Sequence, residues 1–181
     1  MRFPRRNKID SRCHLDKNRN YRKVIDFKPK CYWYSLGDEW YKFWYESEKM
    51  REVRDQVVCQ VSVKRNSFTT LEKKEKGKIL VIDSLDEIKK LNRRYSVVKK
   101  IITSKKVYNW RLIDFNKLSE TYGGIEFRNY SKIKKEINGN KRLNWRRDYL
   151  WYFTLDVSSG CVWDLNLINV KEVGKLKNFV Q

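Results

Sequence analysis

Residues 28–44 read Lys-Pro-Lys-Cys-Tyr-Trp-Tyr-Ser-Leu-Gly-Asp-Glu-Trp-Tyr-Lys-Phe-Trp, a stretch crowded with aromatic side chains. The run 32–35 has strand-forming residues, Gly37 breaks it, and aromatic residues at helical spacing follow. This order predicts a sharp turn from a strand into a helix over 38–54, whose inward face carries Trp40, Phe43, Trp44 and Met50. A corner of this kind can form one wall of a pocket.

The rest of the chain alternates between strand and helix patterns. Apolar alternation predicts strands over 57–63, 78–83, 125–127, 149–157 and 161–165. Helical patterns cover 84–95, 111–122 and 131–137, and the first begins with the capping-box pair Ser84 and Glu87. Residues 97–102 and 107–110 fit either a strand or the start of a helix, and 158–160 reads as a tight turn. We therefore expect an α+β fold, a single domain with a mixed or antiparallel sheet flanked by helices.

Charge is the main compositional signal. The 181 residues include 42 Lys and Arg against 22 Asp and Glu, a formal net charge of +20. Small soluble domains usually carry a net charge of about 2 to 8 in magnitude. The excess favours a polyanionic partner, and nucleic acid binds dispersed cations through its phosphates. The alternatives are a membrane surface, an acidic protein lattice, or a Lys-rich composition without a partner.

Cysteine spacing and hydropathy further limit the classes of protein to which this chain could belong. The four cysteines form no C-x-x-C pair, so we expect reduced thiols and no metal site. No secretory leader and no apolar run long enough to span a membrane occur, so we expect no membrane association. The expected location is the cytoplasm or nucleus, where thiols stay reduced. We expect a basic N-terminal arm over 1–30, a core domain over 31–168 and a C-terminal tail over 169–181.

Familiar catalytic motifs are absent. The chain has no phosphate-binding G-x-x-x-x-G-K-[ST], no G-x-G-x-x-G, no H-E-x-x-H and no G-x-S-x-G. Its one histidine, His14, makes histidine metal clusters and catalytic triads hard to build. Phosphate-loop and dinucleotide-fold chemistry are therefore disfavoured.

Three segments carry a resemblance, and they lie over 28–35, 122–126 and 156–163. They read Lys-Pro-Lys-Cys-Tyr-Trp-Tyr-Ser, Tyr-Gly-Gly-Ile-Glu and Asp-Val-Ser-Ser-Gly-Cys-Val-Trp. In order and content they resemble an uncharacterised family of phages and large DNA viruses, with the patterns K-P-x-G-L-W-Y-S, D-G-I-E-I and W-D-x-x-S-G-C-I-W. The resemblance covers about 28–168, with Cys31-Tyr32 in place of Gly-Leu and Gly123-Gly124 in place of Asp-Gly.

The order of these segments is similar to that of the ADP-ribosyltransferase superfamily, whose members hold nicotinamide between aromatic rings and orient the ribose with a glutamate. This resemblance implies an ADP-ribosyltransferase-like architecture that uses NAD. It assigns Glu126 as the catalytic carboxylate, Tyr34 and Ser35 to the nicotinamide pocket, and His14 to the adenosine side. The departures at Cys31 and around His14 indicate, as an alternative, a copy that has lost activity.

Each of these residues also has a structural alternative. Glu126 can be an exposed position on a strand whose inward residues are Ile125 and Phe127. Trp33, Trp40, Trp44, Trp151 and Trp163 can be core residues, because large aromatic side chains dominate burial in small domains. His14, in a basic arm, can contact solvent or phosphate.

The basic stretch over 130–149 is the best candidate for nucleic-acid contact. It interleaves cations with the rings of Tyr130, Trp145 and Tyr149, a combination that suits phosphates and stacked bases. The candidate binding residues are Lys132, Lys134, Lys135, Lys141, Arg142, Trp145, Arg146 and Arg147. A solvated helix face is the alternative.

The sequence leaves three hypotheses. The first is a viral or phage ADP-ribosyltransferase-like protein, active or catalytically degenerate, that acts on or is bound to nucleic acid. The second is a non-enzymatic basic module that binds nucleic acid. The third is a structural component of a virion or other large assembly, with viral or assembly proteins as partners.

Overall fold

The computed structural model describes residues 28–29, 31–37, 39–46, 57–102, 107–175 and 178. Its strands are β1 (Tyr32–Ser35), β2 (Val57–Val63), β3 (Phe68–Thr69), β4 (Ile79–Ile82), β5 (Ser96–Ile102), β6 (Val107–Ile113), β7 (Gly124–Phe127), β8 (Ser159–Val162) and β9 (Ile168–Lys175). Its helices are α1 (Glu39–Glu46), α3 (Leu85–Tyr95), α4 (Phe115–Ser119), α5 (Tyr130–Gly139), α6 (Trp145–Asp148) and α7 (Leu150–Phe153), with a 3₁₀ turn at Leu165–Leu167. The α+β class predicted from the sequence is confirmed.

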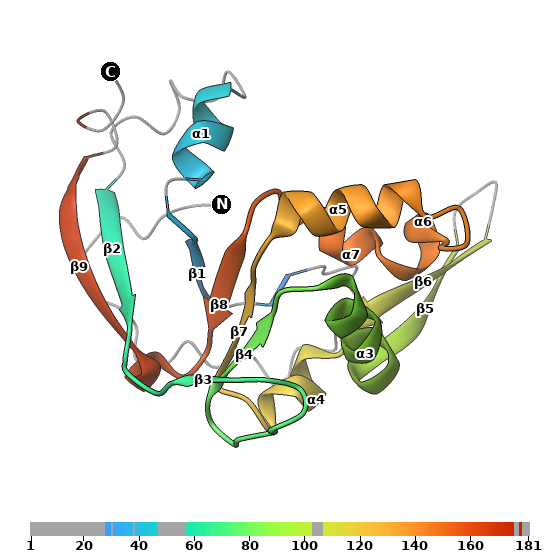
Figure 1. Ribbon diagram of the computed structural model, residues 1–181, viewed down its shortest axis with the longest axis horizontal. Helices are drawn as coiled ribbons and strands as arrows, with labels where there is room; N and C mark the ends of the chain where they lie inside the picture. Colours follow the sequence, from blue (N-terminus) through green and yellow to red (C-terminus); the bar gives the residue numbers. More distant parts are fainter. Residues whose placement is uncertain are drawn as a thin grey trace.

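A five-stranded mixed sheet forms the centre, in the order β1-β8-β7-β4-β3. Strands β3, β4 and β7 run parallel, whereas β8 is antiparallel to both β7 and β1. Two further pairs, β2–β9 and β5–β6, are separate two-stranded sheets. Figure 1 shows α3, α5 and α7 on one side of the central sheet and the β2–β9 pair with α1 on the other. Both faces of the sheet are therefore covered, one by helices and the other by a strand pair and a helix.

The face toward the helices is the main hydrophobic core. Strand residues such as Ile125 and Phe127 pack there against buried residues of α3, α5 and α7. The ring of Phe127 lies 5.7 Å from that of Trp151 and 5.9 Å from that of Tyr152, centroid to centroid. Because side chains alternate along a strand, the residues between them face the β2–β9 side. That second face carries Tyr34, Glu126 and Gly160.

Helix α3 begins as its sequence predicts. The Ser84 side chain accepts a hydrogen bond from the Glu87 backbone N–H at 3.4 Å, and Glu87 Oε2 accepts one from the Asp83 N–H at 2.8 Å. Buried Ile88, Leu91 and Tyr95 form the inward stripe. The capping prediction is confirmed, with the Glu87 carboxylate bonded one residue further back than in the standard box.

The prediction of a strand over 149–157 is wrong, because the segment is largely helical. The short helices α6 and α7 occupy 145–153. Neighbouring residues Trp151 and Tyr152 are 1% and 0% exposed, so both are buried in the same core. A half-buried strand cannot bury two successive side chains on one face.

The predicted helix over 111–122 is too long. Residues 111–113 complete β6, where Arg111 pairs with Val98 of β5. The helix α4 starts only after Asp114, whose side chain accepts a hydrogen bond from the Lys117 N–H at 3.1 Å. Cross-strand pairing and this cap divide the segment.

The tight turn predicted at 158–160 is wrong as well. Ser159 and Gly160 lie in β8, where Gly160 is paired with Tyr34 on one side and Glu126 on the other. Residues 169–175, placed in a C-terminal tail by the sequence, form most of β9 and pair with β2. In α1, Trp40 is half-buried and Phe43 is 36% exposed, so Phe43 does not face inward as predicted. The side chains of Trp44 and Met50 lie outside the described residues.

The β5–β6 hairpin projects from the body beside α6 (Figure 1). Four of its apolar side chains are largely exposed, namely Val98, Ile102, Val107 and Tyr108. None of the helices in the described ranges combines the length and the apolar character that crossing a membrane requires.

Candidate functional site

The central feature of the second sheet face is a hydrogen bond between Tyr34 and Glu126. The Tyr34 hydroxyl donates to Glu126 Oε2 at 2.7 Å, and the two residues are 92 positions apart in the chain. Glu126 is 2% exposed and Tyr34 is 7% exposed. The structure thus brings together two residues that the sequence assigned to one pocket. The alternative of an exposed Glu126 is wrong.

Gly160 makes this contact possible. It lies on β8, opposite Tyr34 on β1 and opposite Glu126 on β7. A Cβ atom on Gly160 would overlap the Tyr34 ring. The missing side chain therefore lets the tyrosine cross over β8 and reach the carboxylate on the next strand.

Arg128 is the second partner of Glu126. Its Nε donates to Glu126 Oε1 at 2.6 Å, and its guanidinium carbon lies 5.0 Å from the centroid of the Phe68 ring. The Arg128 side chain is 41% exposed, whereas that of Glu126 is 3% exposed. Each carboxylate oxygen thus has one strong donor, which is what a buried charge requires.

The electrostatics of the pair keep Tyr34 protonated. Burial raises the pKa of Tyr34 well above its ordinary value, and the neighbouring Glu126 carboxylate raises it further. The phenol is therefore a permanent hydrogen-bond donor at any ordinary pH. The hydroxyl thus holds the carboxylate in place as a hydrogen-bond donor.

Ser35, which was also assigned to the pocket, is not part of this cluster. Ser35 follows Tyr34 on β1, so its side chain leaves the opposite face of the sheet, where its hydroxyl donates to the Gly37 carbonyl at 3.4 Å. His14 lies outside the described residues. Tyr34 and Glu126 are thus the predicted site residues that the structure brings together, and Arg128 joins them.

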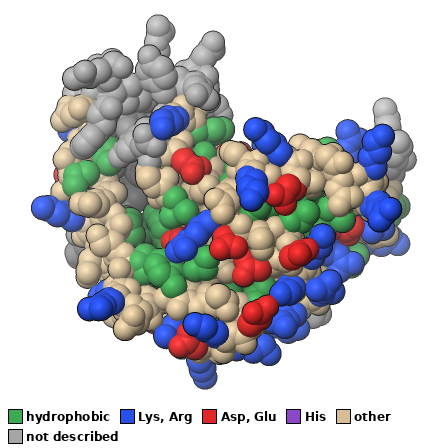
Figure 2. All heavy atoms as spheres, viewed as in Figure 1, with side chains coloured by type: hydrophobic (Ala, Val, Ile, Leu, Met, Phe, Trp, Pro, Cys, Tyr) green, Lys and Arg blue, Asp and Glu red, His purple; other side chains and the backbone are tan. Residues whose placement is uncertain are grey.

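The predicted nucleic-acid residues lie on α5, α6 and the segment between them. Lys132, Lys135, Lys141 and Arg142 are exposed, and none forms an ion pair within the described part of the chain. In Figure 2, Lys and Arg side chains predominate at the edge of the molecule that carries α6 and the β5–β6 hairpin. We call Lys132, Lys135, Lys141 and Arg142 the open cations.

Trp145 already stacks on another ring within the protein. Its ring stacks on Phe153 with centroids 4.9 Å apart and an interplanar angle of 26°. The Arg146 guanidinium lies 5.3 Å from the Trp145 ring, and the Lys134 ammonium lies 5.5 Å from the Phe153 ring. The four side chains form a cation–π column that anchors α5, α6 and α7 to one another.

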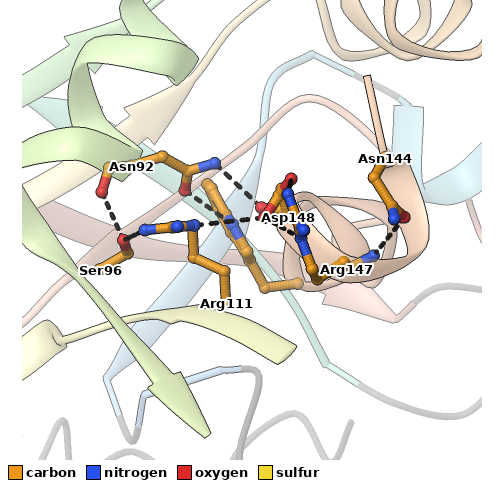
Figure 3. Close-up of polar contacts among 7 residues, drawn as sticks. Asn92, Ser96, Arg111, Asn144, Arg147 and Asp148 are labelled. Carbon is orange, nitrogen blue, oxygen red and sulfur yellow. Dashed lines mark hydrogen bonds and ion pairs between the residues drawn. The ribbon is translucent and has the colours of Figure 1, made fainter. Parts of the chain in front are cut away.

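Arg147 is held by Asp148. Its Nη2 and Nε bind the two carboxylate oxygens at 2.8 Å and 3.0 Å, while Arg111 Nε reaches Asp148 Oδ1 at 3.3 Å. Figure 3 shows this cluster joined to Asn92, whose side-chain N–H donates to the Asp148 carbonyl at 2.9 Å. The cluster ties α3, β6 and α6 together.

The described residues offer no metal site but do offer groups that could contact a cofactor. Among the described residues, no group of three His, Cys, Asp or Glu is placed to hold a metal ion. For NAD, the relevant groups are the Tyr34 ring, the Glu126 carboxylate and the guanidinium of the partly exposed Arg128. An aromatic ring, an acceptor for ribose hydroxyls and a cation match the chemistry of a dinucleotide.

Sequence reasoning missed Arg128, Gly160 and Asp148. The signal for Arg128 was its position two residues after Glu126, which places both on the same side of an extended segment. Gly160 was taken as a turn glycine, although close approach of another chain segment is an equally good reason for a glycine. For Asp148, the acidic residue next to Arg146-Arg147 was the available signal.

Comparison with known proteins adds no relative. No family model, no curated protein and no solved structure matches this chain.

Proposed function

We propose that this chain is an ADP-ribosyltransferase-like protein that acts on or is bound to nucleic acid, with Glu126 as its catalytic carboxylate. The observation that carries the proposal is the contact between Tyr34 and Glu126 at 2.7 Å. Two motifs far apart in sequence were assigned to one pocket, and their key side chains meet on one sheet face.

The proposed roles follow from the donor set. In the proposed reaction the bond between the ribose anomeric carbon of NAD and nicotinamide breaks, nicotinamide leaves, and a nucleophile of the target takes the ADP-ribosyl group. Tyr34 and Arg128 occupy one acceptor position on each oxygen of Glu126. A carboxylate has about four acceptor positions, so Glu126 retains capacity to accept a hydrogen bond from a ribose hydroxyl. Its charge would stabilise the positive charge that develops at the anomeric carbon.

Access to Glu126 requires movement of a neighbour, because the residue is 2% exposed. The proposal therefore includes a local movement of the segments that cover Glu126 when dinucleotide binds, with the Arg128 contact to Glu126 kept.

The test is NAD binding, by calorimetry, and NAD turnover for the wild type and for Glu126→Gln and Tyr34→Phe. We expect Glu126→Gln to retain binding within a few-fold and to lose turnover, because it removes the charge and preserves shape. Tyr108→Phe is the matched control, because Tyr108 is an exposed tyrosine on β6. Absence of saturable NAD binding by the wild type would end this proposal.

A second candidate is a non-enzymatic module that binds nucleic acid. The favouring observation is the set of open cations on a chain of net charge +20. In this module the Tyr34–Glu126–Arg128 cluster is a structural polar core with no catalytic role. Single-stranded and duplex oligonucleotides, titrated over a range of salt concentrations, test it, because phosphate contacts release counterions and binding then weakens steeply with salt.

A further inference from the structure

Arg128 uses one edge of its guanidinium for Glu126 and leaves the other edge free. The hydrogen bond to Glu126 comes from Nε. Within the described part of the chain, neither Nη atom of Arg128 has a hydrogen-bond partner. A guanidinium has five N–H donors, so the terminal fork is available.

Two contacts hold this fork in one orientation. The Nε bond fixes the guanidinium to a carboxylate that Tyr34 also holds, and the Phe68 ring lies 5.0 Å from the guanidinium carbon. Phe68 itself is 36% exposed, and the Arg128 side chain is 41% exposed. The fork is thus positioned before any ligand arrives, on a side chain that is partly exposed.

A held arginine fork of this kind matches the geometry of a phosphate group, which accepts two parallel N–H bonds. Because both contacts already restrict the side chain, Arg128 loses less conformational entropy on binding an anion than a flexible arginine would. The position also fits the fold, because Arg128 directly follows the carboxyl end of β7, which is parallel to β4. Ligands of mixed α/β sheets commonly bind beyond the carboxyl ends of parallel strands.

We infer that Arg128 is a phosphate-binding residue, oriented by Glu126 and Phe68, that takes a phosphate group of a nucleotide. The inference rests on the proposed function only for the nucleotide nature of the ligand. It adds a binding role for Arg128 and a positioning role for Phe68.

The first experiment measures inorganic pyrophosphate binding by calorimetry at low ionic strength. Arg128→Lys keeps the positive charge and loses the fork, so we expect affinity to fall by about tenfold or more, the worth of one charge-assisted hydrogen bond. Arg65→Lys is the matched control, because Arg65 is exposed in the turn after β2. Equal pyrophosphate affinity in the wild type and Arg128→Lys overturns the inference.

A second experiment uses only the wild-type protein, so its result does not depend on whether Arg128→Lys folds. In the wild type, the side-chain ¹⁵N resonances of Arg128 should shift on addition of pyrophosphate, whereas those of Arg65 should not. Unchanged Arg128 resonances at saturating pyrophosphate also overturn the inference.

Two further titrations identify the source of the phosphate. Loss of NAD affinity in Arg128→Lys with unchanged oligonucleotide affinity assigns the site to a dinucleotide, and the reverse assigns it to a polynucleotide. The two proposals fail separately. If pyrophosphate binds through Arg128 but no Glu126-dependent turnover is found, the phosphate site stands and the transferase proposal fails. If turnover is found but pyrophosphate does not bind, the transferase proposal stands and the phosphate site fails.

Discussion

Tyr34 and Glu126 lie on strands that are not neighbours, yet the tyrosine hydroxyl donates to the carboxylate at 2.7 Å across the strand between them. The intervening position is Gly160, paired with both. Because the glycine has no side chain, the side chains of β1 and β7 can meet across β8, and the three strands are linked. The contact couples the edge strand β1 to the buried strand β7.

Replacing Gly160 with alanine should destabilise the protein by about 1 to 3 kcal/mol, the usual cost of overpacking. The new Cβ would overlap the Tyr34 ring, which has no room to move without losing Glu126. Urea unfolding followed by tryptophan fluorescence measures the change. Gly139→Ala is the matched control, because nothing lies within 4 Å of its added Cβ, and it should be neutral or slightly stabilising.

A double mutant tests whether Tyr34 is the cause. Once the ring is removed in Tyr34→Ala, Gly160→Ala should cost much less than it does alone, because the overlapping atoms are gone. Strict additivity of the two free-energy changes would contradict the explanation.

Tyr34→Phe should destabilise the protein by about 1 to 3 kcal/mol, because it leaves one oxygen of a buried carboxylate without its donor. The ring keeps its place over Gly160, so the change isolates the hydroxyl. Thermal and urea unfolding measure it, with Tyr108→Phe on the exposed hairpin as the control. If both variants lose equally little stability, water satisfies Glu126 in place of Tyr34.

The sequence predicted elements whose signals are local and missed those decided by distant contacts. Ser84 and Glu87 predict the start of α3 from residues within one turn, and the alternation over 57–63 matches β2. The aromatic run around Trp151 is buried on several sides, and periodicity cannot separate such a run into strand or helix. Its helical form depends on packing against Phe127, which no local pattern contains.

The candidate site shows the same division. The Ile-Glu-Phe pattern placed Glu126 on a strand, and the resemblance placed it with Tyr34. The partner Arg128 and the spacer Gly160 became visible only with the strand order, because their roles arise from the register of β7, β8 and β1. Ser35 lies apart from the Tyr34–Glu126 contact, because strand alternation sends its side chain to the opposite face from that of Tyr34.

Asp148 should make stability depend on pH in the acid range. Burial raises the pKa of its carboxyl, but hydrogen bonds from Arg147 and Arg111 outweigh burial and hold the pKa below its usual value. Because the folded pKa lies below the unfolded pKa of about 3.9, this stabilisation is complete above that pH and is lost as pH falls through the folded value.

Asp148→Asn should therefore lower stability at neutral pH by about 1 kcal/mol, and the difference from the wild type should shrink as the pH falls below about 4. Urea unfolding at several pH values measures this. Asp86→Asn serves as the control, because the Asp86 side chain is 80% exposed and its pairing with Lys89 lies on the surface. A gap between wild type and Asp148→Asn that stays constant from neutral to acid pH would show that the carboxylate charge is not the source.

The open cations should govern nucleic-acid affinity through salt. Replacing Lys132, Lys135, Lys141 and Arg142 with glutamine removes up to four phosphate contacts, so the slope of log affinity against log salt should become shallower by about 3 to 4 on duplex DNA. Fluorescence anisotropy with a labelled oligonucleotide between low and physiological salt measures the slope. The matched control replaces Arg65, Lys73, Lys74 and Lys76, which are equally exposed and lie between β2 and β4. Both sets remove the same formal charge, so net charge alone would weaken binding equally in the two variants. A larger loss of slope in the first set locates the interface on α5 and α6, while equal losses would show that binding is spread over the whole basic surface.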